Sequence, residues 1–301
     1  MAEPRVQEEL SSYRLLDAES LPDGMARVAR GRIGHALGQL QNGEGSDKAV
    51  HEARKDMKKL RAVLRLTRPE LGGKIYRREN ARFREVALSL SGVRDARAML
   101  NALDALEEGG LHVATAARLR RELEKHKASL ARDEQAVKIA VDELESAREE
   151  VADWPLERDD WGAIEGGLRR IYRQGRRRMR EAESEPSTEA LHEWRKRVKD
   201  LWYQLALLRE TWPAVVGPES DEAHALSEKL GDDHDLAMLW DFTVDGNMAS
   251  ERLRNALDSR RVELQTEAFA TGRRLYAERP RTFTARLASY WNAWRRGLIH
   301  A

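Results

Sequence analysis

The sequence predicts an all-α protein built from two related helical halves, and three observations support this. Residues of high helix propensity, above all Ala, Leu, Arg, Glu and Lys, dominate the 301-residue chain. Alternating apolar and polar runs, which mark half-buried strands, are scarce. A stretch near residue 50 returns near residue 191. Hydrophobic residues make up 41% of the chain, which is enough for a core.

Capping residues and helix breakers divide the first half into segments. Ser20, followed by Leu21 and Pro22, is typical of an N-cap with an early proline. Ser46 or Asp47 can cap the next helix. The expected breaks are Gly, Pro or loop segments: residues 42–46, Pro69, Gly72-Gly73, Gly92 and Gly109-Gly110.

The stretch from Leu111 to Trp154 has neither Gly nor Pro and predicts one long amphipathic helix, or two with a soft kink. Pro155 marks a boundary, and the helical pattern restarts at Trp161. A C-terminal helix is expected over residues 283–298, packed back on the rest. We therefore expect an N-terminal segment (1–19), a first helical bundle (20–155) and a second helical bundle with the C-terminal helix (156–301).

The internal repeat is clear from the residues. VHEARKDMKKLRAVLRLTR (50–68) and LHEWRKRVKDLWYQLALLR (191–209) share nine identities in nineteen positions. LSLSGVRDARAML (88–100) is echoed by LSEKLGDDHDLAML (226–239), which we interpret as a turn in each half. Each half is expected to contain four or five helices, and short connections make successive helices antiparallel neighbours. The two halves are expected to pack about a pseudo-twofold axis.

Charge is strongly segregated although the formal net charge is only +1. Residues 51–68, 74–84, 169–180 and 192–209 together hold 24 Lys and Arg against 5 Asp and Glu. Their cations recur every three or four residues, so they share helix faces, where like charges repel. An anion would offset that repulsion, which favours a polyanion site. The alternative is a salt-bridge lattice, for example with the acidic segment 142–150.

Candidate chemistry is limited. The chain has no Cys, which excludes thiol catalysis, disulfides and Cys-ligated metal sites, and it has no Walker A, G-x-G-x-x-G or G-x-S-x-G motif. His51 and His192 lead the two cationic stripes, where an imidazole can contact phosphate, pack structurally or act as a general acid or base. Asp232, Asp233, His234 and Asp235 can ligate a metal, or Asp232 or Asp233 can cap a helix. The eight tryptophans are expected to pack in the core, with base stacking as the alternative.

With these residues in view, the chain resembles the CHAD family, the conserved histidine α-helical domain. The resemblance rests on His51-x-x-Arg54-Lys55-x-x-Lys58-Lys59-Leu60-Arg61, on its echo from His192 to Lys199, and on the two Asp-containing segments 90–95 and 230–235. It covers about residues 20–295. It implies two four-helix bundles related by a pseudo-twofold axis, a basic groove or pore that binds inorganic polyphosphate, and association with polyphosphate granules.

By this match the ligand-binding candidates are His51, Arg54, Lys55, Lys58, Arg61, Arg65, His192, Arg195, Lys196 and Lys199. The stripe argument adds Arg173 and Arg177, with Arg78 and Arg82 on a shorter stripe. The second copy departs from the first, because Trp202 and Ala206 replace Arg61 and Arg65. Binding is therefore expected to be asymmetric.

The sequence thus predicts a non-enzymatic polyphosphate-binding protein without metal or cofactor. The physics agrees, because a flexible chain of phosphates without bases needs rows of Arg and Lys. The alternatives are a general polyanion or nucleic-acid binder and a metal-dependent phosphohydrolase. A further alternative is a scaffold protein whose basic stripes pair with acidic helices of a partner. No apolar stretch is long enough for a membrane helix and no secretory signal is evident, so a cytoplasmic location is expected.

Overall fold

The computed structural model describes residues 13–42, 46–90, 92–129 and 134–297, without the side chains of residues 92–95 and 134. These ranges contain helices and no strand, so the predicted all-α class is confirmed. None of the helices in them is long and apolar enough to cross a membrane. The elements are α2 (Leu21–Asn42), α3 (Asp47–Leu66), α4 (Arg68–Ser89), α5 (Gly92–Glu108), α6 (Val113–Ser129), α7 (Glu134–Glu150), η1 (Val151–Asp153), α8 (Gly162–Ser184), α9 (Thr188–Leu207), η2 (Arg209–Thr211), α10 (Pro213–Asp245), α11 (Glu251–Leu275) and α12 (Pro280–Gly297).

Serine residues cap the helices α2, α3 and α9. The hydroxyls of Ser20 and Ser46 accept hydrogen bonds from the backbone amides of Asp23 and Ala49, at 3.2 and 3.3 Å. Ser187 does the same at the start of α9. Each cap satisfies an amide that the first helical turn leaves without a partner. The caps expected at Ser20 and Ser46 are confirmed.

The expected breaks are placed with mixed accuracy. The segment Leu111–Trp154 forms two helices, α6 and α7, and the residues that join them lie outside the described ranges. The break expected at Pro69 and Gly72-Gly73 comes earlier, because α3 ends at Leu66. The helix α4 is then kinked at Gly72, whose φ is 71°. Glycine adopts this positive φ without steric cost because it has no Cβ. The C-terminal helix is confirmed as α12.

The turn expected in the second half at residues 230–235 is wrong. These residues lie inside α10, which runs unbroken from Pro213 to Asp245. Asp232 and Asp233 therefore cap no helix. The carboxylate of Asp233 is buried and accepts hydrogen bonds from Arg261 at 2.9 Å and from Gln265 at 2.7 Å, both on α11. This residue joins two helices.

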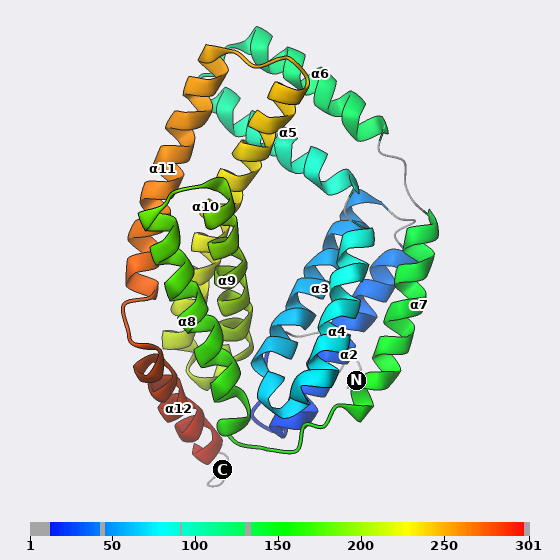
Figure 1. The fold of residues 1–301 in the computed structure, drawn as a ribbon. Coiled ribbons are helices and arrows are strands. Elements are labelled where there is room, and N and C mark those ends of the chain that lie inside the picture. Colours follow the sequence, from blue (N-terminus) through cyan, green and yellow to red (C-terminus); the bar gives the residue numbers. More distant parts are fainter. Residues whose placement is uncertain (1–12, 43–45, 91, 130–133, 298–301) are drawn as a thin grey trace.

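The helices form two groups that share one core (Figure 1). In one group α2, α3 and α4 pack in sequence, and α7 covers α2 and α4; in the other α8, α9 and α10 pack in sequence, and α11 lies along α10. The groups meet where α3 contacts α9 and where α8 contacts α3 and α4. One continuous apolar cluster runs from Leu15 to Trp291 across both groups. The pseudo-twofold relation and the division at residues 19 and 155 stay predictions.

The helices α5 and α6 pack away from the first group. A second apolar cluster joins Leu103 of α5 and Leu119 of α6 to Leu239 of α10 and Leu257 of α11. In Figure 1 these helices span the end of the molecule between α3 and α11. The chain thus places part of its first half against its second, and α5 closes one side of the space between α3 and α9.

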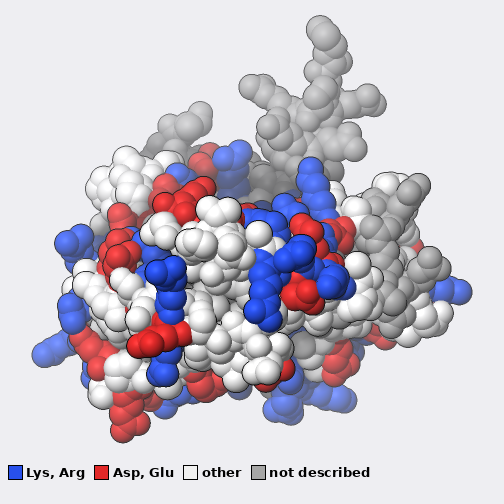
Figure 2. Space-filling view, turned by 90° about the horizontal axis from the view of Figure 1, so that it is seen from above, with Lys and Arg blue, Asp and Glu red and all other residues white. Residues whose placement is uncertain are grey.

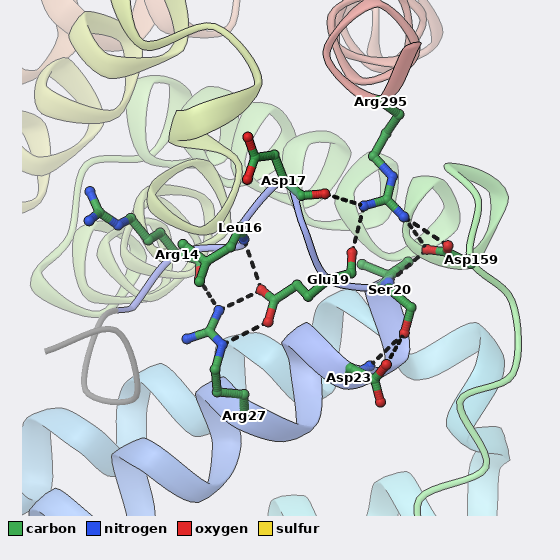
Figure 3. A network of polar contacts seen from close by, with 10 residues as sticks. Arg14, Leu16, Asp17, Glu19, Ser20, Asp23, Arg27, Asp159 and Arg295 are labelled. Atoms are coloured by element: carbon green, nitrogen blue, oxygen red, sulfur yellow. Dashed lines mark hydrogen bonds and ion pairs between the residues drawn. The ribbon is translucent and has the colours of Figure 1, made fainter. Parts of the chain in front are cut away.

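A polar network ties both ends of the described chain together (Figure 3). Arg295 of α12 donates to the carboxylate of Asp159, at 2.7 and 2.8 Å, and to the backbone oxygen of Glu19, at 2.6 Å. The side chain of Glu19 accepts from Arg27 of α2 at 2.7 Å. Asp159 also accepts from the amide of Leu21, the first residue of α2. The N-terminal segment, the inter-half connection and α12 are therefore fastened at one point.

Candidate functional site

A cavity of about 460 Å³ lies between the two groups of helices, bordered by α3, α5, α9, α10 and α11. Six of the ligand-binding candidates predicted from the sequence line it, which are His51, Arg54, Lys55, Lys58, Arg195 and Lys199. They come from both copies of the repeat. Residues of both basic stripes therefore line one cavity.

The spacing within each helix explains this convergence. On α3, steps of three and four residues from His51 to Lys58 keep the cations on one face. On α9, Arg195 and Lys199 are four residues apart and line the opposite side. Gly231 of α10 lies against the Arg195 guanidinium, where an added Cβ would be 2.8 Å from a terminal nitrogen. The glycine leaves room for that side chain at the cavity wall.

Two cations of the cavity lie outside all four basic windows of the sequence. Arg97 comes from α5 and Arg260 from α11. Neither sits on a basic stripe, so charge density does not reveal them. Arg97 reaches the cavity only because α5 crosses to the second group of helices. Tertiary packing, which the sequence pattern does not encode, therefore completes the cationic lining.

The α10 side of the cavity is acidic. Glu228, Asp232 and Asp235 line it at steps of four and three residues, on one face of the helix. Glu228 lies 3.8 Å from the ammonium group of Lys199. Loss of hydration, reinforced by the neighbouring carboxylates, raises the pKa of Asp232. The cavity therefore has a cationic wall and an acidic wall.

A second concentration of cations, the arginine cluster, continues from the cavity along α3. It comprises Arg61, Arg65, Arg68, Arg170, Arg173 and Arg197, from α3, α4, α8 and α9. The buried carboxylate of Asp200 pairs with Arg65 at 3.2 Å and with Arg197 at 3.1 Å. Burial, and then repulsion by Arg65, lowers the pKa of Arg61 to about 10. Burial, followed by charge repulsion from Arg68, lowers the pKa of Arg170.

The predicted residues Arg61, Arg65 and Arg173 thus belong to this cluster and do not line the cavity. Arg177 is exposed on α8 and pairs with Glu181 of the same helix at 3.5 Å. Lys196 is exposed and pairs with Glu193. In the view from above, basic and acidic side chains are interspersed over much of the described surface, and a group of Lys and Arg near the centre has a few acidic residues beside it (Figure 2). The cationic excess is concentrated at particular helix faces.

For Arg78 and Arg82 the salt-bridge alternative is correct. Arg82 contacts Glu79 at 3.3 Å, Glu143 at 3.2 Å and Glu150 at 2.7 Å, and Arg78 contacts Glu79 and Glu150. Two of these acids lie in the acidic segment 142–150 on α7. Neither arginine lines the cavity. Their stripe fastens α4 to α7.

Replacing Arg82 by Gln is expected to lower the free energy of unfolding by about 1–3 kcal/mol, because the fully buried carboxylate of Glu79 loses a charged partner. Urea unfolding measures this change. The double variant Glu79→Gln/Arg82→Gln should recover part of the loss, since it removes the buried charge as well. An unchanged midpoint in Arg82→Gln would contradict the structural assignment.

His192, predicted as a phosphate contact, lies beside the cavity and does not line it. Its ring packs against that of His234 on α10, with centroids 4.5 Å apart. The pKa of His192 is lowered to about 4, first by burial and then by His234, Lys196 and Arg195, while Glu189 opposes the shift. The imidazole is thus held neutral. This arrangement favours the structural interpretation of this histidine over the phosphate contact.

The low pKa of His192 predicts a pH dependence of stability. Between about pH 6.5 and pH 4 the unfolded chain binds a proton at this residue that the folded chain does not, so stability falls as the pH is lowered through that window. In the variant His192→Gln the free energy of unfolding should depend less steeply on pH there. Urea unfolding at several pH values provides the measurement, and identical slopes in both proteins would refute the prediction.

The metal alternative gains no support from the described side chains. Among them no group of three or more His, Asp or Glu is arranged to hold a metal ion. Asp233 is engaged by Arg261 and Gln265. The side chains of Arg94 and Asp95, the first-half counterparts of His234 and Asp235, lie outside the described residues.

The fold and the site define an all-helical protein with a cationic cavity between two groups of helices. The CHAD domain matches residues 28–244, from α2 to the end of α10, and the chain therefore belongs to the CHAD family. This family is associated with polyphosphate binding. The resemblance seen in the sequence is confirmed, although the match ends before α11 and α12. No curated protein matches the chain.

Proposed function

We propose that this chain binds inorganic polyphosphate as a non-enzymatic module. One observation carries the proposal: His51, Arg54, Lys55 and Lys58 of one repeat meet the Arg and Lys side chains of the other in a single cavity. Such side chains bind phosphate oxygens, Arg through forked donors and Lys as a movable charge. Family membership supports the same ligand.

The arginine cluster extends this surface beyond the cavity. Lys58, Arg61 and Arg65 follow one another at steps of three and four residues, so the stripe continues down the same face of α3. At about 1.5 Å per residue, the stripe from His51 to Arg65 is about 21 Å long. A linear polyanion has the shape to follow it. We further propose that the protein associates with polyphosphate granules through this surface.

The proposal is tested by titrating the protein with long-chain polyphosphate, single-stranded DNA and double-stranded DNA at matched phosphate concentration. Low and physiological salt are compared, and free phosphate is measured in the same samples. Polyphosphate binding that survives physiological salt while DNA binding fades is the expected result. Equal binding to all three polymers would indicate general electrostatic attraction, and released phosphate that a chelator stops would indicate a metal-dependent phosphohydrolase.

A further inference from the structure

The acidic wall of the cavity is unfavourable for inorganic polyphosphate. Glu228, Asp232 and Asp235 face the same space as the cations of α3. A ligand that presents only phosphate oxygens is repelled by these carboxylates. A ligand that also carries N–H or O–H donors gains hydrogen bonds from them. The two walls therefore fit a molecule with a phosphate end and a hydrogen-bond-donating end.

Aromatic rings border the same cavity. Tyr203, Trp202 and His224 all line it, and the ring centroid of Trp202 lies 4.5 Å from that of Tyr203 and 3.9 Å from that of His224. The side chain of His224 is 46% exposed, so this end of the ring group faces solvent. A further planar ring can pack there, as bases do on aromatic side chains. An inorganic chain has no group that uses this surface.

The imidazole of His224 and the three carboxylates lie in one row on α10. His224, Glu228, Asp232 and Asp235 follow one another along α10 at steps of four, four and three residues. Glu228 and Asp232 are exposed as well as lining the cavity, which places them with His224 at its mouth. The cations of α3 stand across the same space. The volume of about 460 Å³ is in the range of sites for small organic ligands.

We propose that the cavity binds a nucleoside polyphosphate. The phosphates contact Lys55 and Lys58, the base packs on His224 supported by Trp202, and base amino or ribose hydroxyl groups donate to the carboxylates of α10. This inference rests on the proposed function, because the same cations take the phosphates. It adds a second class of ligand. Trp202 stands where the first repeat has Arg61, and its ring supports binding of the base.

The test compares ATP with inorganic tripolyphosphate, which has the three phosphates without the nucleoside. Isothermal titration calorimetry at constant ionic strength, with a chelator present, measures both affinities on the full chain. Long-chain polyphosphate is titrated in parallel. We expect ATP to bind about ten-fold or more tightly than tripolyphosphate, in line with the contribution of one stacked base. Equal affinities, or stronger binding of tripolyphosphate, would overturn the inference.

Two variants sharpen the comparison. His224→Ala should remove most of the preference for ATP and leave the tripolyphosphate affinity nearly unchanged. The matched control is His126→Ala, since His126 packs on Phe242 and is not part of the cavity lining. Asp232→Asn should strengthen tripolyphosphate binding while lowering the ratio of ATP to tripolyphosphate affinity. Misfolding would weaken both ligands together and cannot produce that pattern. A ratio that neither variant lowers would contradict the nucleotide site.

The outcomes separate the two proposals. Binding of long-chain polyphosphate without a preference for ATP retains the proposed function and rejects the nucleotide site. Binding of ATP without binding of polyphosphate retains the cavity as a nucleotide site and rejects the polyphosphate function. Failure of all three probes rejects both.

Discussion

Reversing the charge of two cavity lysines, Lys55→Glu and Lys58→Glu together, should weaken binding of long-chain polyphosphate by at least about 100-fold. Both side chains line the cavity and are partly exposed, so the fold tolerates their replacement. Each loses a charge-assisted contact worth roughly 1.5–3 kcal/mol and adds repulsion. Arg54 is left in place because it also donates to the backbone oxygen of Ala87.

The control for this experiment changes net charge equally at another site. Lys138→Glu and Arg148→Glu alter two exposed cations of α7, away from the cavity. Fluorescence titration at several salt concentrations measures both double variants. The cavity variant should also show a shallower dependence of log K on log salt, because fewer counterions are released. Equal weakening by both variants would mean that overall charge, and no defined site, attracts the ligand.

Replacing Asp200 by Asn should lower the free energy of unfolding by about 3–5 kcal/mol. Asp200 is 6% exposed, and its carboxylate pairs with Arg65 and Arg197 inside the arginine cluster. Removing one partner of such a buried pair leaves the cations without compensation. Long-chain polyphosphate should restore more stability to this variant than to the unmodified protein, because a bound polyanion supplies the missing negative charge.

The comparison for this prediction is Asp221→Asn. Asp221 pairs with Arg209 at 2.8 Å on the surface, where its side chain is 62% exposed. Its loss should cost less than about 1 kcal/mol. Urea unfolding with and without polyphosphate gives both quantities. If Asp200→Asn and Asp221→Asn were equally mild, Asp200 would have no special part in offsetting the arginine cluster.

The all-helical class and several helix ends could be predicted because their determinants are local. Ser20 and Ser46 act as caps through contacts three residues away, and Gly110, at φ 95°, makes its turn through its own backbone. The turn predicted at Gly231 is wrong because this glycine serves a contact between two helices. Gly231 accommodates the guanidinium of Arg195 from a neighbouring helix, a need that sequence spacing does not reveal.

The site could be predicted only where its cations share a helix face. His51, Arg54, Lys55 and Lys58 follow helical spacing and reach the cavity together. Arg97 and Arg260 depend on how α5 and α11 pack, so no pattern along the chain identifies them. The local density of Lys and Arg in the sequence also does not distinguish cations that line the cavity from cations that pair with acidic side chains. Arg78 and Arg82 belong to a basic window yet pair with α7.

The packing of α5 and α6 against α10 and α11 also affects how the protein is made. Leu119 and Leu123 of α6 are buried in the same apolar cluster as Leu257 and Leu264 of α11, which leave the ribosome about 140 residues later. At roughly 5–20 residues per second, this apolar surface stays uncovered for about 7–28 s during synthesis. The nascent chain therefore presents a site for chaperones over that interval. The ligand cavity, which needs α11, assembles among the last parts of the molecule.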